Sequence, residues 1–150
     1  MTGENTGEKS GKLPYIIGIG ASAGGLEALQ QFFQHMPANS GLSFVVVQHL
    51  SPDYKSFMAD ILGKYTQMKV TQIKDDMEIV PDTVYLIPPK YNLTIQNGKL
   101  KLTEFVHGML NHPIDVFFSS LAQEQKERAI AVVMSGTGSD GTSGIKVVKE

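Results

Sequence analysis

A serine, a histidine and an aspartate each follow a short apolar run in this sequence, and together these side chains could hydrolyse an ester or an amide. Ser22 and His49 follow the first two such runs, and Asp140 lies in the glycine-rich loop after the last one. In a triad of this kind the serine attacks a carbonyl carbon, the histidine carries the proton, and the aspartate orients the imidazole. Ligand sites of open parallel sheets lie at the carboxyl ends of the strands, so we expect the three side chains to meet at one edge.

The residues around Ser22 have the spacing of a nucleophile elbow. Gly20, Ser22 and Gly24 fit the G-x-S-x-G pattern between a predicted strand and a predicted helix, which is the context that this motif requires. Small neighbours leave the hydroxyl exposed and let the following amides face an oxyanion, and the N-terminus of the next helix favours negative charge. The alternative interpretation is a glycine-rich turn that happens to contain a serine.

Two nucleotide-binding interpretations compete with the triad. Gly18 and Gly20 open a strand-helix-strand unit, but the third glycine, Gly24, comes one residue later than in the dinucleotide fingerprint. The second strand also ends in Gln48 and His49, where an acidic residue should meet the ribose. The loop 136–141 has the glycine spacing of a phosphate cradle, but Thr142 stands where a P-loop has lysine, which argues against a nucleotide triphosphatase.

The other histidines and acids are interpreted as structural or solvated groups. His35 falls in the last turn of a predicted helix, where a histidine interacts favourably with the helix dipole. His107 and His112 lack a clear third ligand, so we expect no metal site there. Asp75, Asp76 and Glu78 surround a predicted turn and are expected to be solvated acids rather than a catalytic pair. We expect no cofactor.

The elements that would position the triad are those of an α/β protein. Apolar runs at 15–20 and 44–47 predict buried strands, and those at 70–73, 84–87 and 129–134 predict three further strands. Apolar spacings of three and four predict helices over 26–36, around 57–62 and around 114–121. Asn97 and Gly98 between alternating apolar residues predict a tight hairpin. A further helix is expected to begin near Thr142. The predicted fold is a three-layer, doubly wound, mostly parallel sheet flanked by helices, with an antiparallel β-hairpin.

Length and composition restrict the class of protein. The chain has 150 residues, 13 Lys and Arg against 15 Asp and Glu, a net charge of −2 and no cysteine. These values favour one globular domain, exclude disulfides and thiolate zinc sites, and argue against nucleic acid as a partner. No apolar run approaches the ~20 residues that a membrane span needs, and no signal peptide is evident, so we expect a cytoplasmic location without membrane insertion. Residues 1–13 are expected to form a flexible tail and residues 14–150 a single domain.

Several motifs, taken in order along the chain, give the sequence a specific likeness. It resembles the chemotaxis receptor-glutamate methylesterase family, the CheB type, from about Tyr15 to Glu150. The blocks that carry the likeness are Ile19 to Ala28, Gln48-His49, Ser56-Phe57, Val84 to Pro89, Pro113 to Phe118 and Ser135 to Gly141.

The resemblance implies a serine esterase that removes methyl esters from receptor glutamates, with glutamine deamidation as the family's second activity. It implies Ser22 as nucleophile, His49 as general base and acid, and Asp140 as the orienting carboxylate. The oxyanion support would come from the loops that contain Ala23 and Thr137, where the family commonly has threonine and methionine, respectively.

The likeness also carries expectations about partners and about the rest of the polypeptide. The implied substrate is the methylated cytoplasmic domain of a chemoreceptor. Members often carry a phosphorylation-controlled receiver domain, which the short polar N-terminus cannot form, and the family's esterase domain continues beyond the equivalent of Glu150. We therefore expect a domain truncated at its C-terminal end, from a fusion with a receptor methyltransferase. The alternative function is a non-catalytic interaction or regulatory module of such a sensory protein.

Overall fold

The structure is a computed structural model, and it describes residues 15–21, 25–48, 58–108 and 111–134. The predicted tail, residues 1–13, and the helix predicted near Thr142 lie outside the described residues. The boundary of a single domain over residues 14–150 therefore stays a prediction.

The centre of the fold is a parallel sheet of five strands in the order β3-β5-β2-β1-β8. Its strands in that order are β3 (Lys69–Gln72), β5 (Thr83–Leu86), β2 (Ser43–Gln48), β1 (Ile16–Ala21) and β8 (Ile130–Met134). Every residue of β1, β2 and β5 is buried, which is why these strands appear in the sequence as continuous apolar runs rather than alternating ones. The five strands predicted from those runs are confirmed.

A second, antiparallel sheet has the order β4-β7-β6. Strands β6 (Tyr91–Gln96) and β7 (Lys99–Glu104) form the predicted hairpin, and Asn97 and Gly98 at its turn have φ angles of 52° and 78°. Two consecutive residues with positive φ are the requirement of a type I′ turn, so the Asn-Gly signal was informative. The third strand, β4 (Met77–Glu78), was not predicted. Because it pairs with β7, the hairpin is part of a small three-stranded sheet.

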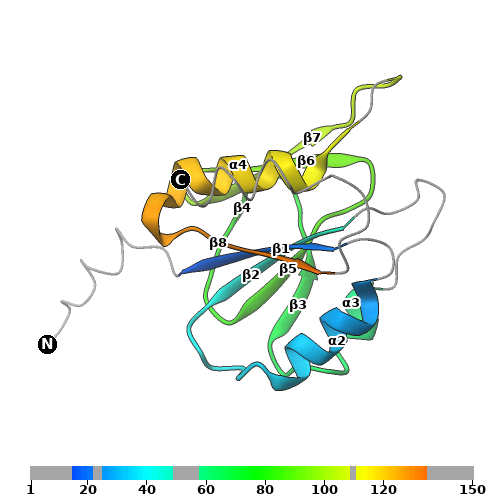
Figure 1. The fold of residues 1–150 in the computed structure, drawn as a ribbon, viewed down its shortest axis with the longest axis vertical. Coiled ribbons are helices and arrows are strands. Elements are labelled where there is room, and N and C mark those ends of the chain that lie inside the picture. Colours follow the sequence, from blue (N-terminus) through cyan, green and yellow to red (C-terminus); the bar gives the residue numbers. More distant parts are fainter. Residues whose placement is uncertain (1–14, 22–24, 49–57, 109–110, 135–150) are drawn as a thin grey trace, which may run out of the picture.

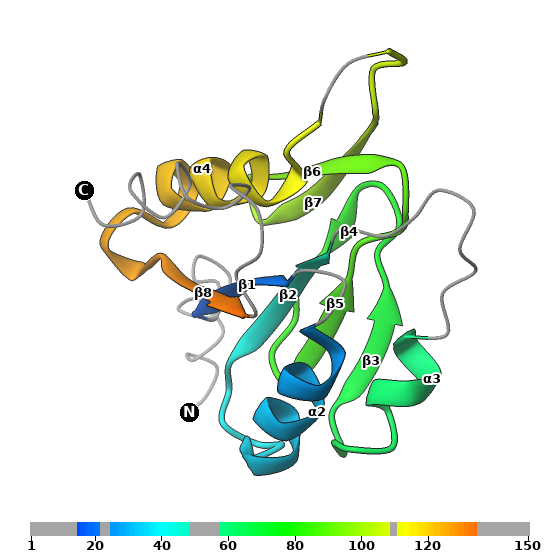
Figure 2. The same cartoon turned by 45° about the vertical axis from the view of Figure 1, so that its right-hand side comes forward.

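Helices cover the main sheet on both faces, which confirms the predicted three layers. Helices α2 (Leu26–His35) and α3 (Met58–Leu62) lie on one face, whereas α4 (Pro113–Gln125) and the second sheet lie on the other (Figures 1 and 2). A short 3-10 helix (Lys126–Arg128) follows α4 and leads into β8.

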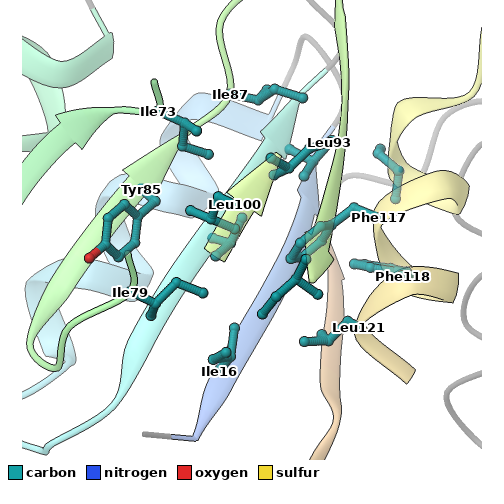
Figure 3. Close-up of a cluster of buried hydrophobic side chains, with 14 residues drawn as sticks. Ile16, Ile73, Ile79, Tyr85, Ile87, Leu93, Leu100, Phe117, Phe118 and Leu121 are labelled. Atoms are coloured by element: carbon teal, nitrogen blue, oxygen red, sulfur yellow. The ribbon is translucent and has the colours of Figure 1, made fainter. Parts of the chain in front are cut away.

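The core is divided by the main sheet into two clusters of buried side chains. Alternate residues of β1 belong to different clusters: Ile16 packs with α4 and the second sheet, and Ile17 packs with α2 and α3. Figure 3 shows the first cluster, in which Phe117 and Leu121 of α4 point towards the main sheet. This alternation follows from the period of two in a strand and gives β1 a packed layer on each side.

Candidate active site

The ends of three neighbouring strands meet at the carboxyl edge of the main sheet. In the parallel register, Ala21 at the end of β1 pairs with Gln48 at the end of β2 and with Met134 at the end of β8. Strands β1, β2 and β8 therefore end side by side at the same edge of the sheet. The sequence predicted that the strands preceding its reactive residues end at one edge, and the register confirms this for the strand ends.

The predicted site residues themselves lie outside the described residues. Ser22 follows Ala21 directly, His49 follows Gln48 directly, and Asp140 comes later in the loop after Met134. The predicted oxyanion residues, Ala23 and Thr137, also lie outside the described residues. Their roles accordingly stay predictions.

The edge lies at a change in the direction of strand addition. From β1 the chain passes through α2 to β2 on one side, whereas β8 lies on the other side of β1 and is reached through α4. Helices α2 and α4 cover opposite faces, so the connections diverge around the end of β1 (Figure 1). In open α/β sheets this divergence leaves the crevice in which ligands bind.

Two glycines of β1 have a packing role that the sequence analysis did not identify. A Cβ atom on Gly20 would lie 2.6 Å from Cγ2 of Ile114, and a Cβ atom on Gly18 would lie 3.1 Å from Leu121 Cδ2 and Phe117 Cε2. Both glycines therefore allow α4 to approach the backbone of β1 closely. The signal that could have revealed this was the spacing of two, because glycines on one face of a buried strand often mark a close approach.

A small apolar cavity lies beside the end of β2. Its volume is about 110 Å³, and it is lined by the carboxyl ends of β2, β5 and β3 and by the start of α3. Gln48, which is 7% exposed, contributes its polar side chain to the lining. The lining residues are Val46, Gln48, Met58, Ala59, Gln72, Leu86 and Ile87.

The acids at the turn before β4 have structural partners. The Asp75 carboxylate accepts a hydrogen bond from the Leu102 amide at 2.9 Å, and Asp76 accepts one from Lys101. The hydrogen bond and charge of Lys101, with a smaller attraction from Lys99, lower the pKa of Asp76 below its usual value. The same hydrogen bond raises the pKa of Lys101. These acids hold the turn against β7, beside the second sheet rather than the main sheet that carries the candidate site.

The remaining histidines do not form a site with one another. Nδ1 of His35 lies 2.8 Å from the Gln31 carbonyl oxygen on the exposed side of α2, which agrees with the surface role predicted for it. His107 is exposed after β7, and His112 precedes the first residue of α4. Among the described residues, no group of three His, Asp or Glu side chains could hold a metal ion.

No helix in the described ranges is long and apolar enough to span a membrane.

The chain is similar to several known proteins. Residues 17–150 match the CheB methylesterase family. A 104.1 kDa protein encoded in the hypE 3′ region of Rhodobacter capsulatus is 46% identical over 91 residues, which are 61% of this chain and 10% of that protein. The protein-glutamate methylesterase/protein-glutamine glutaminase 1 of Carboxydothermus hydrogenoformans is 32% identical over 142 residues, with 90% of this chain and 42% of that protein covered. This chain thus spans less than half the length of either relative.

The fold has a close counterpart among solved structures. The CheB methylesterase catalytic domain of Thermotoga maritima superposes with a TM-score of 0.81 at 31% sequence identity, and the match covers 92% of this chain and 76% of that one. The family match, the relatives and this fold agree, and the resemblance detected in the sequence is confirmed. The chain belongs to the CheB methylesterase family.

Proposed function

We propose that this chain is the catalytic domain of a serine hydrolase that removes methyl esters from glutamate side chains of bacterial chemoreceptors. The observation that carries the proposal is the register of the sheet, in which Ala21 pairs with both Gln48 and Met134. The residues assigned to the chemistry follow these three strand ends. Membership of the CheB methylesterase family and the activity for which the Carboxydothermus relative is named support the same substrate class.

In the proposed mechanism Ser22 is the nucleophile and His49 is the proton carrier. The Ser22 hydroxyl oxygen bonds to the γ-carbonyl carbon of the glutamyl methyl ester while His49 takes its proton. The tetrahedral intermediate collapses, the bond to the methoxy oxygen breaks, and His49 returns the proton so that methanol leaves. A water molecule then attacks the acyl-enzyme while His49 takes its proton. The bond to Ser22 Oγ breaks, His49 returns the proton to that oxygen, and the glutamate side chain is released.

Asp140 and the backbone amides complete the proposed site. Asp140 would accept a hydrogen bond from the His49 imidazole, which fixes the tautomer and stabilises the charged form. The backbone N–H groups at Ala23 and Thr137 would stabilise the oxyanion, because amides that point at developing charge lower the barrier. Backbone donors do not depend on side-chain identity, so the departures from the family's usual residues at these two positions leave this role intact.

The same acyl-enzyme would also serve glutamine deamidation, with ammonia rather than methanol as the leaving group. The Carboxydothermus relative bears both activities in its name. We assign the reaction to the cytoplasm, with the methylated cytoplasmic part of a chemoreceptor as the protein substrate. A methyltransferase domain in the same polypeptide is the proposed companion, and the 104.1 kDa mass of the Rhodobacter relative is far above that of a single domain.

The proposal is tested by methanol release from membranes that contain methyl-esterified chemoreceptors. We expect the wild-type protein to release methanol and the Ser22→Ala variant to lose nearly all of this activity, since removal of a triad member costs on the order of 10⁴-fold or more. Ser40→Ala is the matched control, because Ser40 is exposed in the loop before β2, at the opposite edge of the sheet. It should behave as wild type. Folded wild-type protein that releases no methanol would favour the non-catalytic module instead.

A further inference from the structure

Helix α4 runs antiparallel to β1 along a face of that strand which carries glycine in place of side chains. Ile114 in its first turn lies over Gly20, and Phe117 and Leu121, further along the helix, lie over Gly18. The N-terminal end of α4 is therefore directed towards the carboxyl edge of the sheet (Figures 1 and 3). This arrangement brings the first turn of the helix against the last residues of β1.

The contact at Gly20 is closer than the contact at Gly18. Cγ2 of Ile114 lies 2.6 Å from the position that a Cβ atom on Gly20 would occupy, and Cδ1 of Ile114 lies 3.2 Å from it. The branched methyl group thus occupies the space in which Gly20 would carry a side chain. Ile114 is only 3% exposed, so neighbouring side chains also restrain it.

Gly20 is confined in the other directions as well. Within the sheet it pairs with Val47 of β2 on one side and with Val133 of β8 on the other. The next residue, Ala21, has no exposed surface and packs on the opposite face with the cluster beneath α2. The position of the last two residues of β1 is therefore set by two strands, by α2 and by Ile114.

We propose that Ile114 is a positioning residue for the esterase reaction. Its Cγ2 methyl group, seated on Gly20, fixes the end of β1 and so sets where the chain delivers Ser22, two residues further on. The inference rests on the proposed function, because it concerns the same nucleophile. Catalytic groups need placement within about 0.5 Å, and a displacement of 1 Å from a remote change costs up to about 10²-fold in rate. Ile114 itself acts only through the backbone of β1.

Two substitutions at this position separate shape from volume. Ile114→Val removes Cδ1 and keeps Cγ2 on Gly20, whereas Ile114→Leu keeps the side-chain volume and loses the branch at Cβ. The matched control is Leu121→Ile, which makes the reverse exchange of the same two residues on the same helix, over Gly18. The two exchanges between isoleucine and leucine conserve volume and are well tolerated in cores, and Ile114→Val removes a single methyl group, so all three variants should remain folded at the assay temperature, as circular dichroism can verify.

The experiment measures methanol release as kcat and KM, together with the rate at which a fluorophosphonate probe labels Ser22. We expect Ile114→Leu to lower both kcat and the labelling rate by on the order of 10-fold with little change in KM. Ile114→Val and Leu121→Ile should stay within about 3-fold of wild type, because the first keeps the contact at Gly20 and the second lies away from it. If Ile114→Val keeps kcat and the labelling rate while Ile114→Leu lowers both, general destabilisation is excluded as the cause.

Three other results would overturn the inference. If Ile114→Leu keeps the wild-type kcat and labelling rate, the contact at Gly20 has no positioning role, although the esterase proposal stands. If Leu121→Ile lowers kcat and labelling as much as Ile114→Leu, the effect belongs to the stability of α4 in general. Wild-type protein that shows no Ser22-dependent methanol release would refute the proposed function itself, and the positioning role with it.

Discussion

Substitution of Gly20 by alanine should destabilise the protein through a single contact. The new Cβ atom would lie 2.6 Å from Cγ2 of Ile114. Ordinary carbon contacts are about 3.5–4.0 Å, so roughly 1 Å of overlap must be relieved by movement of α4 or β1. Such overpacking costs about 1–3 kcal/mol, and the loss of glycine's freedom in the unfolded chain offsets roughly 0.4–1 kcal/mol of it.

The expected net loss for Gly20→Ala is about 1–2 kcal/mol in the free energy of unfolding, measured by urea denaturation. For a chain of this length that corresponds to a fall in Tm of about 2–8 °C. Gly18→Ala is the comparison, because its Cβ atom would meet only the ends of side chains, at 3.1–3.2 Å, and these need to move by a few tenths of an ångström. We expect Gly18→Ala to cost less than Gly20→Ala.

A double-mutant cycle assigns the cost to Ile114. In an Ile114→Ala background the atoms that collide with the new Cβ are absent, so Gly20→Ala should cost nothing or stabilise the protein slightly. The coupling free energy should then be about 1–3 kcal/mol, in the range of residues in direct contact. If Gly20→Ala costs the same in both backgrounds, the collision with Ile114 is not the cause and the packing argument is refuted.

Three further predictions concern contacts away from the candidate site. Ser120 Oγ accepts a hydrogen bond from the Ile95 amide at 2.8 Å and donates one to the Ile95 carbonyl oxygen at 3.2 Å. Ser120→Ala should therefore lower the free energy of unfolding, measured in urea, by about 1–3 kcal/mol. An unchanged free energy of unfolding would show that these two hydrogen bonds do not stabilise the protein. Tyr85 is 2% exposed, and its hydroxyl also forms hydrogen bonds with two backbone groups. Tyr85→Phe should lower the free energy of unfolding by a similar amount, about 1–3 kcal/mol, measured by thermal denaturation. An unchanged Tm would contradict the role of these hydrogen bonds. Lys101 lowers the pKa of Asp76, so the stabilisation from this half-exposed pair should be present at neutral pH and lost as the pH falls through that lowered pKa. In an NMR titration, Lys101→Met should raise the pKa of Asp76 towards its usual value. An unchanged pKa of Asp76 would refute the pairing.

Much of the fold could be predicted because local signals and tertiary packing agree. Apolar spacing over Leu26 to Met36 predicted α2, which ends at His35, one residue earlier. The Asn97-Gly98 pair predicted its hairpin because few other residues adopt two positive φ angles in succession. Such elements depend on residues close together in the sequence.

Other features depend on partners distant in the chain and left no local pattern. Strand β4 has only two residues, Met77 and Glu78, and exists because they pair with Leu100 and Lys99 of β7. Gly20 was likewise interpreted only as a turn residue. Its role in helix packing could not be predicted, because the helix that lies against it comes more than ninety residues later.

The candidate site was predictable to the level of its strand ends. The register confirms that the strands before Ser22 and His49 are neighbours and that β8 joins them on the other side of β1. The geometry among the side chains of Ser22, His49 and Asp140 lies outside the described residues, so their chemistry stays a prediction.

The most direct test of the central claim is to identify the residue that becomes covalently modified. Protein treated with a fluorophosphonate probe would be digested and the adduct located by tandem mass spectrometry, with methanol release measured on the same sample. We expect one adduct, on Ser22, with loss of methanol release in proportion to labelling, and slow labelling in the His49→Ala variant. An adduct on another residue, or methanol release that survives complete labelling of Ser22, would contradict the account.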